Sequence, residues 1–100
     1  MVRPTRVGVS MKVFMTERDL PGITMDQLGA AQAAVIGESQ RASEAGTPVR
    51  YLRSMYVPGD NRCACLFEAN SADDVCRVND AAGVPYTRVV EAHDLPSPQS

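Results

Sequence analysis

The chain has little that marks a secreted, membrane-spanning or nucleic-acid-binding protein. It has three cysteines, an odd number that does not suggest a paired disulfide framework and that favours a reducing cytoplasm. No apolar run approaches the roughly 20 residues needed to span a bilayer. Residues 1–10 lack the continuous apolar segment of a signal peptide. The formal net charge of −2 gives no general attraction to nucleic acid or anionic lipid.

Motifs for several common chemistries are also missing. The sequence contains no P-loop, GxGxxG, HExxH or GxSxG pattern. Its single histidine is His93. Arg50, Arg53 and Arg62 are not accompanied by the aromatic signature of RNA-binding sheets. The chain therefore shows no motif for nucleotide-dependent chemistry, zinc proteolysis or RNA recognition.

The composition is that of one globular domain. The chain has 100 residues, of which 44% are hydrophobic and 22% charged, so a packed core is feasible. A domain of this size buries a smaller fraction of its surface than a large one does. Association with a second copy would therefore help to stabilise it.

The clearest structural signal is a strand–turn–strand pattern over residues 48–69. Pro58, Gly59, Asp60 and Asn61 form a cluster of turn residues between two runs rich in β-branched, aromatic and sulfur-containing side chains. The pattern predicts strands over residues 49–57 and 62–69. Strict alternation in the first of these places Tyr51, Met55 and Val57 opposite Leu52 and Tyr56, and in the second Cys63, Cys65 and Phe67 share a face.

Four further elements surround this hairpin. Residues 12–18 and 86–92 read as strands. A capping box of Thr24 and Gln27 predicts a helix over residues 25–45, and Ser71 and Gly83 bracket a shorter helix. Residues 1–10 and 95–100 read as disordered tails, which leaves residues 11–94 as the domain.

The order of these elements, βαββαβ, predicts an α+β fold of the ferredoxin-like type. In this fold a four-stranded antiparallel sheet has the first and third strands at its centre and both helices on one face. The other face would be uncovered, yet its residues are largely apolar. We therefore expect a homodimer in which two such faces meet, as in a dimeric α/β barrel.

Much of the chain resembles a known family. The segments MKVFMTERDLPGIT, PVRYLRSMYVPG, RCACLFEANSADDV and NDAAGVPYTRVVEA resemble small bacterial proteins of unknown function that are named for a nickel-binding member. This family is similar to the dimeric α/β-barrel group. The resemblance covers residues 12 to about 93 and implies nickel as a cofactor. Nickel is well suited to imidazole ligands, and this chain has one histidine.

The predicted strand directions bring polar residues together at two edges of the sheet. One edge gathers five candidate ligand-binding residues: Glu17, Tyr56, Arg62, Tyr86 and Arg88. The opposite edge gathers Arg50, Glu68 and Glu91, and Arg53 lies between the two. A carboxylate beside arginines and tyrosines could bind a polar ligand or act as a base. The alternative is an ion-paired edge that orders the strand ends.

Cys63 and Cys65 are the main candidates for soft-metal ligation. They lie about 6.5–7 Å apart along one face of a strand. Together with Cys76 or His93 they could bind a metal ion, or one of them could be a nucleophile. The alternative is that these small side chains pack in the core beside Phe67.

These observations lead to three hypotheses about function. The first is a protein that binds a small molecule or metal ion in a cavity between sheet and helices. The second is a dimeric α/β-barrel isomerase, cyclase or cofactor-independent oxygenase. It would use Glu17, or otherwise Glu68, as the base, and Arg53, Tyr56 or Tyr86 to hold an anionic intermediate. The third is a structural or interaction module without a small-molecule site.

Overall fold

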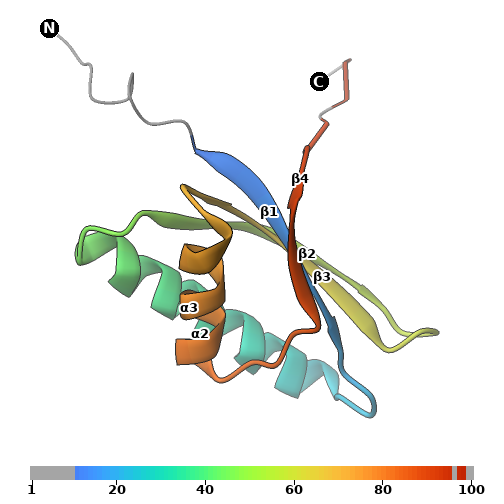
Figure 1. The fold of residues 1–100 in the computed structure, drawn as a ribbon. Coiled ribbons are helices and arrows are strands. Elements are labelled where there is room, and N and C mark those ends of the chain that lie inside the picture. The colour runs from blue at the N-terminus through green and yellow to red at the C-terminus, as the bar shows by residue number, and fades with distance from the viewer. Residues whose placement is uncertain (1–10, 96, 99–100) are drawn as a thin grey trace, which may run out of the picture.

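A computed structural model describes residues 11–95 and 97–98 (Figure 1). Its elements, in chain order, are β1 (Lys12–Asp19), α2 (Met25–Glu44), β2 (Val49–Val57), β3 (Arg62–Ala69), α3 (Ala72–Ala82) and β4 (Arg88–Ala92). This βαββαβ order confirms the predicted ferredoxin-like fold. The tail predicted at residues 1–10 and parts of that at 95–100 lie outside the described residues.

The four strands form one antiparallel sheet in the order β2-β3-β1-β4, with β1 and β3 at the centre as predicted. Both helices lie on the same face of this sheet (Figure 1). Along β1 the buried residues are Phe14, Thr16 and Arg18, whereas Met15 and Glu17 are only partly buried. The alternation therefore separates a face covered by the helices from an open face.

Both helices begin at the predicted caps. The Thr24 hydroxyl accepts a hydrogen bond from the Gln27 backbone at 3.1 Å, and the Gln27 side chain accepts from the Thr24 backbone at 3.0 Å. The Ser71 hydroxyl accepts from the Asp74 backbone at 3.2 Å. Gly83 ends α3 in a left-handed conformation, with φ of 72°, that glycine adopts readily. Within the described ranges, neither helix is long and apolar enough to cross a membrane.

The core lies between the covered face of the sheet and the two helices. Phe67, Ala69 and Val75 have no solvent exposure. Phe67 packs edge-on against Tyr51, with ring centroids 5.7 Å apart. Four polar residues are buried with this apolar cluster: Thr16, Arg18, Ser39 and Asn79. Buried polar groups need hydrogen-bond partners, so these four fix the local geometry.

One prediction about β2 was wrong. Strict alternation puts Tyr51 and Tyr56 on opposite faces, but the pairing with β3 shifts register between Tyr51 and Arg53. The extra residue, Leu52, is a bulge that reverses the alternation beyond it. As a result Tyr51 pairs with Phe67 and Tyr56 with Cys63, both on the covered face.

Candidate functional site

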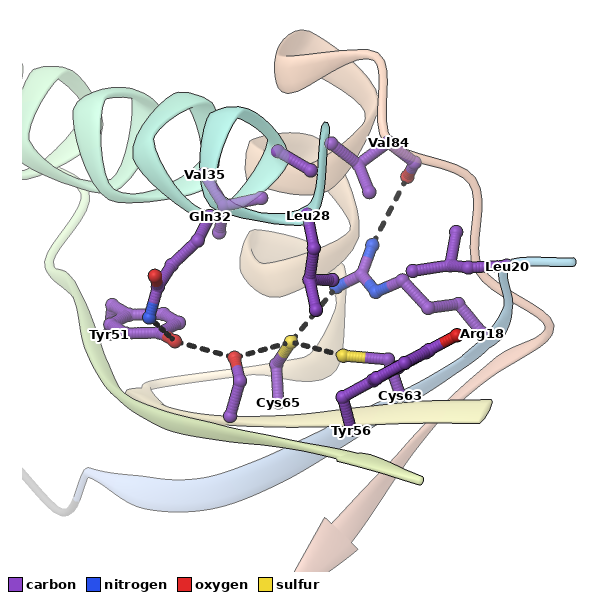
Figure 2. A pocket seen from close by; sticks show the side chains of 12 residues that line it. Arg18, Leu20, Leu28, Gln32, Val35, Tyr51, Tyr56, Cys63, Cys65 and Val84 are labelled. Carbon is purple, nitrogen blue, oxygen red and sulfur yellow. Dashed lines mark hydrogen bonds between the residues drawn. The ribbon is translucent and has the colours of Figure 1, made fainter. Parts of the chain in front are cut away.

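A pocket of about 170 Å³ lies between the sheet and α2 (Figure 2). Its walls are mostly apolar, with several polar side chains among them. The lining residues are Arg18, Leu20, Leu28, Ala31, Gln32, Val35, Tyr51, Ser54, Tyr56, Cys63, Cys65 and Val84. Apolar walls with a few convergent polar groups are typical of small-molecule sites. A cavity of about 150 Å³ is large enough for benzene, so the space suits a molecule of similar size.

A chain of hydrogen bonds runs along the sheet side of the pocket (Figure 2). The Gln32 amide donates to the Tyr51 hydroxyl at 2.8 Å, and this hydroxyl also bonds that of Ser54. The Ser54 hydroxyl in turn donates to Cys65 Sγ at 2.9 Å, and Cys63 Sγ lies 3.9 Å from Cys65 Sγ. The bulge in β2 makes this chain possible, because it brings Tyr51 onto the same face as Ser54.

Arg18 is the most unusual residue of the pocket, since it is a charged side chain only 2% exposed. Its Nη1 donates to the carbonyl oxygens of Val84 at 3.3 Å and Pro85 at 3.2 Å. Its Nη2 lies within reach of three acceptors. These are Thr16 Oγ1 at 2.8 Å, Asn79 Oδ1 at 2.8 Å and Cys65 Sγ at 3.5 Å.

Neither the hydrogen bonds nor the ion pairs of the described residues join Arg18 to an Asp or Glu carboxylate. Its Nε is buried and has no acceptor within the same part of the chain. A buried charge is costly to leave unpaired, so such residues usually have an oppositely charged neighbour. Among the described residues, the guanidinium of Arg18 is therefore held by neutral dipoles.

Sequence reasoning missed both Arg18 and its partner Asn79. An arginine at the end of a predicted strand is normally exposed. The signal in the sequence was the alternation of side chains along a strand, which places Arg18 on the same face as Phe14 and Thr16. Nothing comparable marked Asn79, which lies among the polar residues of α3 and bonds Arg18 across 61 residues of sequence.

Three residues of the predicted edge do come together, but on the open face of the sheet. Glu17 Oε1 lies 3.0 Å from Arg62 Nη2 and 3.1 Å from Arg88 Nε. The hydrogen bond from Arg88, reinforced by the charges of Arg88 and Arg62, lowers the pKa of Glu17 from 4.5. On the opposite edge Glu68 pairs with Arg50 at 3.6 Å. Both candidate bases are thus ion-paired carboxylates away from the pocket.

The other candidates for the Glu17 edge lie elsewhere. Tyr56 pairs with Cys63 on the covered face and lines the pocket, whereas Glu17 lies on the open face. The Tyr86 hydroxyl donates to Asp80 Oδ1 at 3.0 Å, so this side chain faces α3. Hydrogen bonding to Cys76 and Asp80, together with burial, raises the pKa of Tyr86. Arg53, which was predicted to lie between the two edges, forms an ion pair with Asp94.

The lowered pKa of Glu17 leads to a prediction that NMR can test. We expect its carboxyl group to titrate below 4.5 in the wild type, and Arg88→Gln to raise this pKa because the main hydrogen bond is lost. Since the folded pKa is depressed, the contribution to stability is present above the unfolded pKa and disappears as the pH falls through the folded value. Arg50→Gln is the matched control. An unchanged Glu17 titration in Arg88→Gln would contradict the assignment.

Cys63 and Cys65 lie buried on the covered face, and Cys76 is partly buried on α3. Burial raises the pKa of the Cys63 thiol to about 11, and the adjacent Cys65 contributes. His93 lies apart from these thiols, with its Nε2 3.9 Å from a carboxylate oxygen of Glu91. The described residues contain no group of three or more His, Cys, Asp or Glu side chains placed to hold a metal ion.

The Cys63 thiol is expected to resist alkylation. A pKa of about 11 against an ordinary value of 9.0 makes the thiolate about a hundredfold scarcer at neutral pH. We expect iodoacetamide to modify Cys63 at least about a hundredfold more slowly in the folded protein than in the guanidinium-unfolded chain. Because the folded pKa is raised, the stability that this group contributes falls as the pH rises from 9 towards 11.

Peptide mass mapping over time distinguishes the three cysteines in this experiment. Cys76 is the internal comparison, because it is partly exposed whereas Cys63 is 4% exposed. Equal rates for Cys63 and Cys76 in the folded protein would show that Cys63 is accessible and ionises normally.

Comparison with known proteins identifies the family of this chain. No curated protein matches it. A crystal structure of SCO4226 from Streptomyces coelicolor A3(2) matches with a TM-score of 0.67 and 28% sequence identity, over 85% of this chain and 96% of that one. The family described as nickel responsive protein SCO4226-like matches residues 14–92. The chain therefore belongs to the SCO4226-like family.

Proposed function

We propose that this protein binds a small molecule in the pocket between the sheet and α2. The observation that carries the proposal is the pocket itself, which has five polar side chains among apolar walls: Arg18, Gln32, Tyr51, Ser54 and Tyr56. A second support comes from the local structure of two of its walls. The bulge at Leu52 brings Tyr51 to the pocket, and Ala31 leaves space on α2 where a larger residue would fill it.

The enzyme hypothesis receives less support. A general base should have a pKa near the working pH. The pKa of Glu17 is lowered, and its carboxylate is paired with two arginines on the open face. Glu68 pairs with Arg50. Neither carboxylate lines the pocket.

Nickel, which the family name suggests, does not fit the donors that a single described chain presents. Cys63 and Cys65 are on the covered face, whereas His93 follows the last residue of β4 beside Glu91. The thiols are also next to the positive charge of Arg18, which opposes a divalent cation at that position. We therefore include no metal in the proposed binding site.

A neutral aromatic molecule can test the pocket directly. We expect phenol to bind with a dissociation constant in the millimolar range, which corresponds to a binding free energy of about −4 kcal/mol. Binding should shift the amide resonances around Leu28 and Cys65. Ala31→Phe should abolish these shifts because the ring fills the space. Ala33→Phe, at an exposed position of α2, is the matched control. Equal phenol binding by wild type and Ala31→Phe would overturn the proposal.

We also propose that the protein is a homodimer in which two open sheet faces meet, with a reducing compartment favoured by the three free cysteines. The open face carries an apolar row in which Met15 pairs with Leu66 on one side and Val90 on the other. Met55 and Val57 of β2 add further apolar side chains to this face and are 68% and 44% exposed. The flanking charges are already paired within the chain, so a second copy would bury no unpaired charge on Glu17 or Arg53.

Sedimentation measurements test the dimer. We expect the wild type to sediment at twice the mass of one chain at micromolar concentration, and Leu66→Arg to sediment as a monomer that keeps its circular dichroism spectrum. Gln40→Arg, at an exposed position of α2, should remain dimeric. A monomeric wild type would refute this assembly.

A further inference from the structure

The guanidinium of Arg18 is a buried positive charge without a negative partner among the described residues. Its acceptors are two backbone carbonyls, a hydroxyl, an amide and a thiol. We propose that the ligand of this pocket is a small organic anion, and that Arg18 binds its carboxylate. This inference rests on the proposed binding function and adds the chemical class of the ligand.

Charge is the first argument for an anion. Arg18 is 2% exposed, so water screens its charge only weakly. Neutral dipoles reduce the cost of burying a charge but do not cancel the charge itself. A carboxylate in the pocket would form an ion pair in a largely apolar surrounding, where such an interaction is strong. A cation would be repelled there, and a neutral ligand would leave the charge uncompensated.

Hydrogen bonding is the second argument. The Nε atom of Arg18 is buried and has no acceptor in the described structure. A carboxylate oxygen can accept a charge-assisted hydrogen bond from this Nε–H. Nη2 already has two close oxygen acceptors, in Thr16 and Asn79, and a longer contact of 3.5 Å to Cys65 Sγ.

Both N–H groups of Nη2 already have oxygen acceptors at 2.8 Å, so the donor that a ligand can use is the Nε–H. In Figure 2 the guanidinium stands between the Val84 carbonyl on one side and the sulfur of Cys65 on the other. Nη1 would keep its bonds to the Val84 and Pro85 carbonyls when Nε donates to a carboxylate oxygen. The arginine therefore needs no new rotamer to bind a carboxylate.

The remaining walls define the body of the ligand. Leu20, Leu28, Ala31 and Val35 form an apolar lining, and the space of about 170 Å³ suits a single ring or a short branched chain. Gln32 and the hydroxyl of Tyr51 are further polar groups of the lining. The class that these features fit is a small aromatic or branched-chain carboxylic acid.

Benzoate and benzamide separate charge from shape, because the two molecules are nearly isosteric and only benzoate is an anion. We expect benzoate to bind the wild-type protein at least about tenfold more tightly than benzamide, with ionic strength matched by sodium chloride. In 1H–15N spectra benzoate should also shift the Nε–H resonance of Arg18. Equal affinity for the two compounds, or benzoate binding without a shift at Arg18 Nε–H, would overturn the inference.

Two variants test whether Arg18 supplies the preference. Arg18→Met should abolish the preference for benzoate over benzamide, whereas Arg77→Met, at an exposed position of α3, should leave this preference unchanged. Because Arg18→Met removes five hydrogen-bond contacts and could prevent folding, Asn79→Asp provides an independent test. Asn79 does not line the pocket, and an aspartate there would give Arg18 an internal counter-ion.

In Asn79→Asp we expect the preference for benzoate to disappear while phenol still binds. A benzoate preference that persists in this variant would show that the anion is held elsewhere. The phenol measurement also separates the two proposals. If phenol binds but benzoate binds no more tightly than benzamide, the proposal of an anionic ligand is wrong and the proposal of a binding pocket is retained. If phenol, benzoate and benzamide all fail to bind, both proposals are wrong.

Discussion

Replacing Phe67 with alanine is expected to lower the free energy of unfolding by about 3–5 kcal/mol. Phe67 has no solvent exposure and lies on the central strand β3, where it packs edge-on against Tyr51. The substitution removes the apolar contacts of the ring and leaves a cavity that the rigid sheet cannot close. A small domain has a total stability of about 5–15 kcal/mol, so the loss is a large fraction of it.

Urea denaturation followed by circular dichroism measures this effect. Phe67→Leu is the matched control and should cost less than the alanine variant, because much of the side-chain volume remains. Met25→Ala, at a position 74% exposed, should change stability by no more than about 0.5 kcal/mol. A loss of less than about 1 kcal/mol in Phe67→Ala would show that the core relaxes around the missing ring.

Replacing Asn79 with leucine is expected to cost about 3 kcal/mol, the upper end of the range for hydrogen bonds to a charged group. The side chain has no solvent exposure, and its Oδ1 accepts from Arg18 Nη2 at 2.8 Å. Leucine has a similar volume but cannot accept this bond, so the buried guanidinium loses one of its best partners. The Asn79 amide also donates to the Val75 carbonyl at 2.8 Å, and that bond is lost as well.

Ser39→Ala is the control for the loss of stability expected in Asn79→Leu. Ser39 is also a buried polar residue of a helix, and its hydroxyl donates to the Val35 carbonyl at 2.8 Å. No charge is involved, so its removal should cost about 1 kcal/mol or less. Equal losses in Asn79→Leu and Ser39→Ala, measured by the same urea titration, would show that the contact with Arg18 adds nothing.

The fold was predictable because its signals are local. The turn residues at 58–61 gave the bounds of β2 and β3 correctly, and the caps at Thr24 and Ser71 gave the starts of both helices. The start of β4 was less accurate, since the strand begins at Arg88 rather than at residue 86. Before it, Tyr86 turns to Asp80 and Thr87 donates to the Glu17 carbonyl at 2.6 Å. The contact between Thr87 and Glu17 spans 70 residues of sequence and has no local signal.

The site was predictable only in part, for the same physical reason. Strand direction and the alternation of side chains were enough to predict that Glu17 and Arg88 lie close together, because both are on regularly paired strands. Tyr51 depends on the bulge at Leu52, which arises from pairing with β3 and has no marker in the sequence of β2. Arg18 is held in the pocket by Asn79 of α3 and by the Val84 and Pro85 carbonyls, which follow it by 61, 66 and 67 residues.

The position of these partners has a consequence for the order of folding. Arg18 belongs to the first strand, whereas Asn79, Val84 and Pro85 belong to the last third of the chain. Contacts between such distant segments require closure of a long loop and tend to form late. During synthesis the guanidinium must stay hydrated until α3 and the residues after it have emerged. The pocket would therefore be completed in the last steps of folding, and substitutions around Arg18 should mainly speed unfolding.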